Sequence, residues 1–419
     1  MSQIFAVVET QMSGLGLRPL RVAHELGFKT LFVTNNAERY MRLHGASEIF
    51  AHSTDEVVRA DTNSVEAIAA ALHGSCPPGQ LQAVFTVSDY TLPLVTMVAQ
   101  RLGLPTVDPQ AAASARNKLR TRQICSAAGV PCPKFVWATS AAQVDQAAGE
   151  VGLPCVVKPM TDSGSIDVKL CRTLPEVQQH YEHIASTKVD YRGQARMPGA
   201  LIEEYLLGYE VSVETVALDG EIHVLGVSDK PLGPHPYFAE IGATFPSILP
   251  DEVQQRCRRT AVDALRALGH DFGAAHTELK VTADGVKLIE VNARVGGDQM
   301  IDVIELAYGI PLLRELVLLH AGQRPNIVPT RRGGAALRSI VQQQAGCVRA
   351  IHGEDLARRL PGVVELQLHV QPGSRIAPLT SNLQLLGHLL TTAPTPAEAS
   401  RLADAAIGQI SLDIEPAAV

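Results

Sequence analysis

The first hundred residues alternate between short apolar segments typical of strands and longer segments with helical periodicity. The strand-like segments are 4–8, 30–34, 83–87 and 104–107, and the helix-like segments are 17–26, 65–72 and 91–102. Strands separated by helices of this length form βαβ units, which build a parallel sheet. The sequence therefore predicts an N-terminal α/β domain with a parallel sheet.

The pattern changes after Pro109, where a long helix is predicted over 111–128. Further strands are predicted at 154–158, 168–171, 200–205, 210–217, 221–228, 277–282 and 286–291, and further helices over 253–268 and near 396–406. Asp219-Gly220 and Asp284-Gly285 are typical turns of two-residue hairpins. This order predicts an α+β region, in which 200–205, 210–217 and 221–228 share a second sheet. A chain of 419 residues is also long enough for two or three domains.

Lys158 ends an apolar strand and is followed by the turn Thr161-Asp162-Ser163-Gly164-Ser165. An ammonium group that leaves water needs an anionic partner. The backbone N–H groups and hydroxyls of the turn are suited to covering phosphates. A hairpin turn with a lysine that reaches solvent explains the same residues, so the pattern alone leaves both interpretations open.

A second candidate segment begins with Glu203-Glu204-Tyr205-Leu206 at the end of a predicted strand. A strand end that leads into a turn exposes backbone donors and acceptors, which suit the edge of an adenine ring. Glu210 follows at a position suited to ribose hydroxyls. A solvated edge is the alternative explanation for paired acids at this position.

The most informative pattern lies in the hairpin 277–291. Alternate side chains of a strand share a face, so Glu290, Asn292 and Arg294 are expected to project together, and Glu278 can join them from the opposite strand. Two carboxylates and an amide oxygen form a hard-oxygen set suited to Mg²⁺. Arg294 is then placed to clamp a phosphoryl group or a carboxylate. The alternative is an exposed ladder with one salt bridge.

Two further segments carry weaker signals. The loop from His235 to Gly242 contains polar and aromatic side chains, including Glu240, and loops of this kind shape substrate pockets. Ser13-Gly14-Leu15-Gly16 follows the first strand but lacks the third glycine of a dinucleotide loop. A tight strand-to-helix turn explains its glycines, although a substrate contact there is compatible with its place at a strand end.

Composition excludes several classes of protein. The net charge is −7 and no Lys/Arg run occurs, which argues against a nucleic-acid partner. The seven cysteines form no C-x-x-C pair, as expected in a reducing compartment. No apolar run approaches the roughly 20 residues of a membrane helix, and the N-terminus lacks a signal-peptide pattern. We therefore expect a cytoplasmic protein without a membrane partner.

Taken in order, these elements resemble the ATP-grasp superfamily over roughly residues 112–325. The resemblance implies an ATP-grasp fold with a Rossmann-like N-terminal partner, divided as 1–112, a small lid domain 113–201, and a large domain 202–419 with a C-terminal subdomain from about 327. It further implies ATP and two Mg²⁺ ions, with Mn²⁺ as an alternative. The reaction implied is ligation of a carboxylate to an amine through an acyl phosphate.

The resemblance also assigns roles to individual residues. ATP contacts fall on Lys118, Lys158, Ser163, Gly164, Ser165, Glu203, Glu204, Tyr205, Leu206 and Glu210, and metal contacts fall on Glu278, Glu290 and Asn292. Arg294 and Lys158 are the implied catalytic residues, and substrate contacts fall on His235, Glu240, Arg294, Gly296 and Gly297.

Within the superfamily, the chain looks most similar to the L-amino-acid ligases, which join two amino acids, as dipeptide synthetases of the bacilysin type do. The implied partners are small carboxylate and amine substrates, and the resemblance leaves a homodimer open. Two alternatives remain at this point: a carboxylase or purine-biosynthesis ligase of the same superfamily, and a nucleotide-binding regulator without turnover. The set of Glu278, Glu290 and Asn292 argues against a regulator, because binding alone does not require so complete a metal site.

Overall fold

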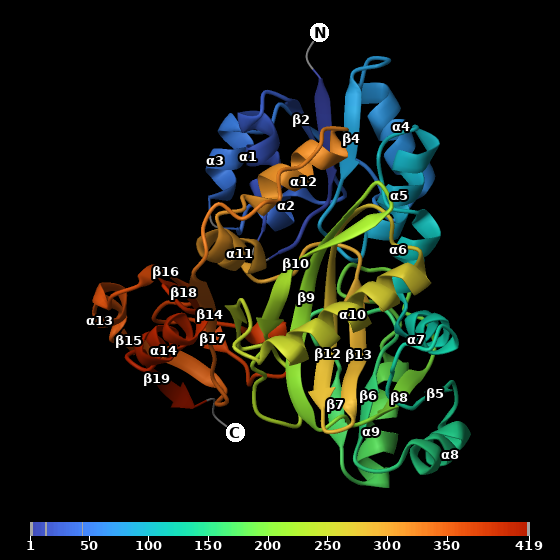
Figure 1. Cartoon of the computed structure of the whole chain (residues 1–419), viewed down its shortest axis with the longest axis vertical. Helices are drawn as coiled ribbons and strands as arrows, with labels where there is room; N and C mark the ends of the chain where they lie inside the picture. Colours follow the sequence, from blue (N-terminus) through green and yellow to red (C-terminus); the bar gives the residue numbers. More distant parts are fainter. Residues whose placement is uncertain (1–2, 13–14, 44, 417–419) are drawn as a thin grey trace.

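The computed structural model describes residues 3–12, 15–43 and 45–416. Of the glycine-containing turn 13–16, only Leu15 and Gly16 fall within this part, and Ser13 and Gly14 lie outside the described residues. The described residues form four sheets with flanking helices (Figure 1). None of the helices within them is long and apolar enough to cross a membrane.

The N-terminal sheet is parallel and has the strand order β3-β2-β1-β4. Its strands are β1 (Ile4–Val8), β2 (Lys29–Thr34), β3 (Glu56–Arg59) and β4 (Leu81–Phe85), and its helices are α1 (Arg18–Glu25), α2 (Ala37–Tyr40), α3 (Ala46–His52), α4 (Val65–Ser75) and α5 (Leu92–Arg101). The predicted parallel α/β unit is confirmed. The strand predicted at 104–107 is wrong: no strand is assigned there, the Leu104 N–H bonds the Ala99 carbonyl at the end of α5, and Pro105 has no N–H to offer a sheet.

The helix predicted over 111–128 is divided in two, α6 (Pro109–Arg116) and α7 (Lys118–Ala127). Asn117 has extended backbone angles (φ −103°, ψ 104°), and its side chain accepts a hydrogen bond from the Arg120 N–H. It therefore ends one helix and caps the next. The division places Lys118 in the first turn of α7, where its side chain reaches the large sheet.

The small sheet is antiparallel, with the order β5-β8-β6-β7. It contains β5 (Phe135–Ala138), β6 (Cys155–Lys158), β7 (Lys169–Cys171) and β8 (Ala200–Glu204), and packs against α8 (Ala141–Val151) and α9 (Leu174–Ser186). These elements have an apolar core of their own, whose buried members all lie between Ala138 and Ile202.

The large sheet has eight strands in the order β13-β12-β9-β10-β11-β14-β18-β16. Its elements are β9 (Gly208–Leu218), β10 (Glu221–Asp229), β11 (Gly242–Phe245), α10 (Asp251–Leu268), β12 (Gly273–Thr282), β13 (Gly285–Asn292), α11 (Met300–Tyr308), α12 (Leu312–His320), β14 (Gly334–Ile340), β16 (Val363–Leu368), β18 (Gly387–Ala393) and α14 (Pro396–Ile407). A separate small sheet joins β17 (Arg375–Ile376), β15 (Gly346–His352) and β19 (Ser411–Pro416), with α13 (Glu354–Arg359) and the 3₁₀ turn η1 (Asn382–Gln384) nearby in the chain.

The expected common sheet for 200–205, 210–217 and 221–228 is therefore wrong in part. β8 pairs with β5 and β6 in the small sheet, whereas β9 and β10 belong to the large sheet. The expected domain bound between residues 201 and 202 falls within β8. We keep the three-domain division as a proposal and place this bound after β8.

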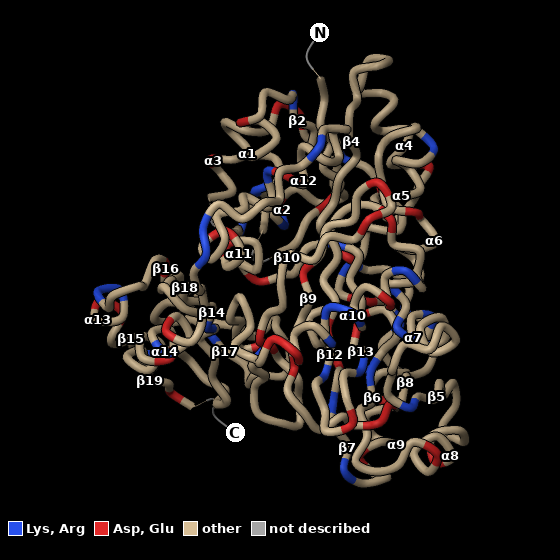
Figure 2. The backbone as a smooth tube through the Cα atoms, viewed as in Figure 1, with Lys and Arg blue, Asp and Glu red and all other residues tan. Residues whose placement is uncertain are grey.

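The small sheet lies at one end of the long axis and the N-terminal sheet at the other, with the large sheet between them (Figure 1). A continuous apolar core joins the N-terminal sheet to the large sheet through α11 and α12. The C-terminal elements lie to one side (Figure 1). Charges of both signs are interspersed along the chain, with basic and acidic segments close together around β6, β12 and β13 (Figure 2).

Candidate active site

A cavity of about 1490 Å³ is lined by residues of the N-terminal, small and large sheets and of the C-terminal region. Most of the predicted site residues line it: Lys118, Lys158, Ser163, Gly164, Ser165, Glu203, Glu204, Tyr205, Leu206, Glu210, Glu240, Glu278, Glu290, Asn292, Arg294 and Gly297. Two do not, His235 and Gly296. The His235 ring bonds the Tyr205 hydroxyl (3.0 Å), and Gly296 packs closely against His276 and Met300.

The two predicted phosphate lysines lie together at one end of this cavity. Lys118 Nζ donates to Glu290 Oε1 (2.9 Å) and to the Asp162 carbonyl (2.7 Å), and Lys158 Nζ contacts Glu203 Oε2 at 2.5 Å. Arg122, which is fully buried, also bonds Glu203 (2.7 Å). Burial lowers the pKa of Lys158, although Glu203 opposes that shift.

The charge balance of this cluster fits a nucleotide. Three cations, Lys118, Lys158 and Arg122, share the carboxylates of Glu203 and Glu290. An excess positive charge in a buried place favours an anionic partner, which triphosphate oxygens would supply. Ser163, Gly164 and Ser165 line the cavity beside the lysines, as a loop that covers phosphates would.

The carboxylates of the segment 203–210 are engaged by cations. Glu204 contacts Lys287 (3.3 Å), and Glu210 contacts Lys280 (3.1 Å). Burial raises the pKa of Glu210, with the lysine opposing. Adenine recognition by this segment, which remains a prediction, therefore rests on backbone groups rather than on the Glu203 or Glu204 carboxylates.

The predicted metal ligands come from the hairpin of β12 and β13. The strand register places Glu278 opposite Glu290 and His276 opposite Asn292. Burial opposes ionisation of Glu278, but Lys230 and His276 hold its pKa well below the ordinary value. The described residues contain no group of three or more His, Cys, Asp or Glu side chains set to hold a metal. Two carboxylates with the Asn292 amide fit Mg²⁺ when phosphate oxygens and water complete its shell.

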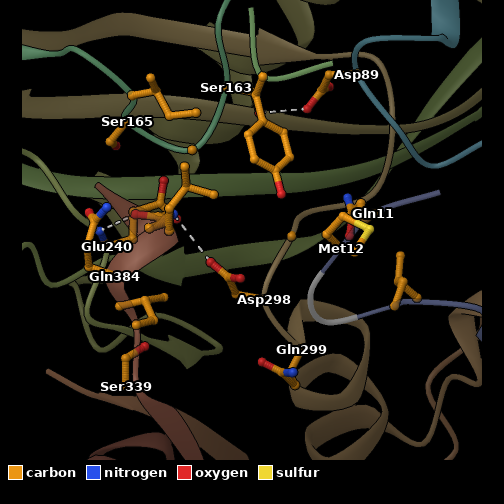
Figure 3. A pocket seen from close by; sticks show the side chains of 18 of the residues that line it. Gln11, Met12, Asp89, Ser163, Ser165, Glu240, Asp298, Gln299, Ser339 and Gln384 are labelled. Carbon is orange, nitrogen blue, oxygen red and sulfur yellow. Dashed lines mark hydrogen bonds between the residues drawn. The ribbon is translucent and has the colours of Figure 1, made fainter. Parts of the chain in front are cut away.

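Arg294 joins the large sheet to the N-terminal domain. Its guanidinium bonds the Asp89 carboxylate, which also accepts a hydrogen bond from the Ser163 hydroxyl (2.9 Å). Figure 3 shows Asp89 beside Ser163 at the cavity wall. Burial opposes ionisation of Asp89, but Arg294 keeps its pKa below the ordinary value. One buried acid thus holds both the candidate catalytic arginine and the loop expected to cover the phosphates.

Lys230 is a buried residue that sequence reasoning missed. Its ammonium lies 2.8 Å from Glu240 and 2.9 Å from Glu278. Burial raises the pKa of Glu240 to about 7, an effect that Lys230 opposes and Glu278 reinforces. A signal was present in the sequence, because Lys230-Pro231 directly follows the strand β10 and repeats the Lys-Pro pair found at the end of β6. Asp89 and Arg122, by contrast, stand in no motif.

The far end of the cavity is bounded by Glu240, Asp298 and the first loop of the N-terminal domain. Glu240 N–H donates to the Asn382 side chain (2.9 Å), whose amide contacts Asp298 (3.3 Å). In the view of Figure 3, Asp298 lies between Glu240 on one side and Gln11 and Met12 on the other. Glu240, Asp298, Gln11 and Met12 line the same cavity as the lysines, and we call the part of the cavity that they line the arm.

Known proteins match the chain along most of its length. The family models described as ATP-grasp N-terminal domain, ATP-grasp domain and L-amino acid ligase C-terminal domain 2 match residues 20–106, 151–302 and 338–415. The uncharacterized protein y4rH of Sinorhizobium fredii is 30% identical over 361 residues, covering 86% of this chain and 74% of that protein. The chain therefore belongs to the ATP-grasp superfamily of ATP-dependent ligases.

Within this superfamily the chain is similar to the L-amino acid ligases. The crystal structure of L-amino acid ligase from Bacillus licheniformis has the same fold, with a TM-score of 0.81 and 21% identity over 99% of both chains. Carnosine synthase 1 of Gallus gallus is 31% identical over 353 residues, 80% of this chain but 36% of that protein. Alanine–anticapsin ligase of Bacillus subtilis is 28% identical over 257 residues, 57% of this chain and 53% of that protein.

Proposed function

We propose that the protein joins the carboxylate of one amino acid to the amine of another, forming an amide or peptide bond through an acyl phosphate. The observation that carries the proposal is that Lys118 and Lys158, Arg294, and the arm residues Glu240, Asp298, Gln11 and Met12 all line one cavity. A nucleotide and two small substrates can therefore meet around a single arginine.

The names of the relatives support amino acids as substrates. Alanine–anticapsin ligase and D-alanine–D-alanine ligase both name alanine, and the C-terminal match at 338–415 is to an L-amino acid ligase model. A carboxylase or a purine ligase is the alternative, since enzymes of both kinds share the fold with TM-scores of about 0.7. The C-terminal match favours the amino-acid ligase.

The proposed mechanism assigns each residue a task. Lys118 and Lys158 bind phosphate oxygens, and the loop of Ser163, Gly164 and Ser165 excludes water from them. Glu278, Glu290 and Asn292 would hold two Mg²⁺ ions, or Mn²⁺ in their place, which neutralise charge on the transferred phosphoryl group. Arg294 stabilises the tetrahedral intermediate after the amine attacks.

Glu240 is proposed to meet the substrate amine. Its pKa near 7 would let it accept a proton from an ammonium group close to neutral pH. The proposed role of His235 is weaker, because its ring faces Tyr205 outside the cavity wall. Gly297 lines the cavity and remains a proposed substrate contact, whereas Gly296 is proposed only as a close-packing position.

The test is phosphate release from ATP with Mg²⁺, screened across single amino acids, amino-acid pairs and bicarbonate, with products identified by mass spectrometry. Release that requires one pair and gives the condensed dipeptide supports the ligase and identifies its substrates. Release with bicarbonate alone supports a carboxylase. ATP binding without release under any condition would favour the regulator and contradict the proposal.

A further inference from the structure

A hairpin of the small domain inserts into the N-terminal domain. Residues 187–196 follow α9, and a bridge between Val189 and Ala195 closes the turn. Asp190 shapes its tip by accepting hydrogen bonds from the Arg192 and Gln194 N–H groups, both at 2.9 Å. The tip carries Arg192 into a buried site between β1, β2 and α2.

The Arg192 guanidinium meets three groups of the N-terminal domain there. It donates to the Tyr40 hydroxyl (3.0 Å), lies 3.4 Å from Glu9 Oε2, and bonds the Thr10 carbonyl. Glu9, Tyr40 and Arg192 are all buried. Glu9 accepts further hydrogen bonds from Thr34 (3.0 Å) and Thr62 (2.8 Å), so the contact is continuous with the end of the parallel sheet.

Thr10 begins the loop that faces the arm of the cavity proposed for substrates. Its hydroxyl donates to the Gly16 carbonyl (2.6 Å), and the neighbouring Gln11 side chain bonds the Val87 carbonyl (3.0 Å). Gln11, Met12, Leu15 and Gly16 all line the cavity. We call the described residues Thr10–Met12, Leu15 and Gly16 the substrate loop.

The small domain and the substrate loop belong to different packing units. The small domain has its own apolar core, whereas the N-terminal and large sheets share one. The small domain also carries Lys158 and the Ser163–Ser165 turn, at the end of the cavity proposed for the nucleotide. A polar contact between separately packed units is a place where two binding events can be coupled.

We propose that Arg192 is a positioning residue that couples the nucleotide-binding small domain to the substrate loop. When the small domain is seated, Arg192 fixes the Thr10 carbonyl and the Tyr40 hydroxyl, and so sets the loop that receives the substrate. Any displacement of the small domain from this position would remove the anchor from the loop. Nucleotide binding and substrate binding therefore favour each other. Arg192 also lines the cavity, but the proposed coupling acts through its contacts with the Thr10 carbonyl and the Tyr40 hydroxyl.

Hydrogen exchange of the full chain tests the coupling without any substrate. In Arg192→Ala, amides of residues 10–12 and 15–17 should exchange about tenfold faster than in the wild type, while those of β12 and β13 stay unchanged. The matched control is Lys188→Ala, which removes an exposed cation from the same hairpin. Among the contacts described, the Lys188 ammonium bonds only the nearby Ala185 carbonyl (2.7 Å). Unchanged exchange in folded Arg192→Ala would overturn the proposal.

Kinetic and binding measurements then separate positioning from general damage. In the wild type, the amino-acid pair found by the phosphate-release screen, added at saturation, should lower the Kd of MgADP about tenfold, and in Arg192→Ala this ratio should fall to about one. A ratio that stays near tenfold in Arg192→Ala, with only the separate affinities reduced, would show a merely structural role and overturn the proposal. If Arg192→Ala does not fold, Arg192→Lys decides, because it keeps the charge but replaces the two guanidinium nitrogens that bond Tyr40 and Thr10 with one nitrogen. The kinetic part rests on the proposed function, whereas the exchange experiment does not, so the two failures are distinguishable.

Discussion

Glu290 stands where the proposed metal and phosphate contacts meet, because it lies opposite Glu278 and bonds Lys118. Glu290→Gln keeps the shape and removes the charge, so turnover should fall about 100-fold or more. Nucleotide affinity should fall by much less, since Lys118 and Lys158 remain. Phosphate release and titration with ADP measure the two effects. Glu252→Gln, in the exposed first turn of α10, is the control, and retained turnover in Glu290→Gln would contradict the assigned role.

Lys230 should contribute strongly to the free energy of unfolding, because it is the buried cation that pairs with two carboxylates. Lys230→Met leaves Glu240 and Glu278 without their shared cation, and we expect a loss of about 3 kcal/mol in the free energy of unfolding. Lys287→Met removes a more exposed partner of Glu204 and should cost less than about 1 kcal/mol. Urea unfolding of both variants compares them, and equal losses would show that burial of the Lys230 pair is unimportant.

At the scale of single residues, the sequence predicted those site residues that belong to a local pattern, such as the alternation of a strand. The alternation of β13 put Glu290, Asn292 and Arg294 on one face, and the hairpin register then placed Glu278 opposite Glu290. Partners supplied by distant segments could not be predicted. Asp89 lies 205 positions from Arg294, and their contact exists only because the N-terminal and large sheets share a core.

The turn after β6 offers a test at the level of an element. Gly164 has a φ of +68°, which strains any other L-residue, so Gly164→Ala should disfavour the turn by about 1 kcal/mol. If the turn covers the phosphates, the KM for ATP should rise about fivefold. Gly149→Ala is the opposite case: this glycine lies inside α8 with open space beside it, and alanine should stabilise the helix by about 1 kcal/mol. An unchanged KM in Gly164→Ala would argue against phosphate covering.

Elements with strong local signals were predicted well, and elements fixed by distant partners were not. Both strands of the hairpin of β12 and β13 were found, although its two turn residues are Ala283 and Asp284 rather than the predicted Asp284 and Gly285, because Gly285 pairs with Thr282. β3 was missed because Glu56–Arg59 is a short edge strand in which exposed and half-buried residues alternate and none is fully buried. β8 was found but assigned to the wrong sheet, since nothing in its five residues identifies β5 and β6 as its partners.

At the scale of the whole molecule, the cavity is formed by the way the sheets are arranged around it, and no single helix or strand forms it alone. Its walls come from three sheets and the C-terminal region. A shared apolar core joins two of these sheets, and buried ion pairs between distant segments add further contacts. Each of these ion pairs forms only while its acid and its base are both ionised, and such pairs occur in every part of the molecule. The pH dependence of stability is therefore a property of the whole chain, and the buried His270 contributes to it in a direction that can be tested.

His270 follows the end of α10 and is buried, with one ring nitrogen 3.4 Å from the Gly273 carbonyl. Burial lowers its pKa to about 4, whereas an unfolded histidine titrates near 6.5. Between these values the unfolded chain binds more protons than the native one. The stability that neutral His270 provides is therefore complete above pH 6.5 and is lost as the pH falls through 4.

The difference between pKa values of about 4 and 6.5 corresponds to about 3 kcal/mol. His270→Gln cannot take up this proton, so its free energy of unfolding should fall about 3 kcal/mol less than that of the wild type between pH 7 and pH 4. Urea unfolding at several pH values measures the two slopes. His73→Gln, which removes an exposed histidine from α4, should follow the wild type. Parallel slopes for wild type and His270→Gln would mean that His270 is already protonated in the native state, and that charge can be accommodated between α10 and β12.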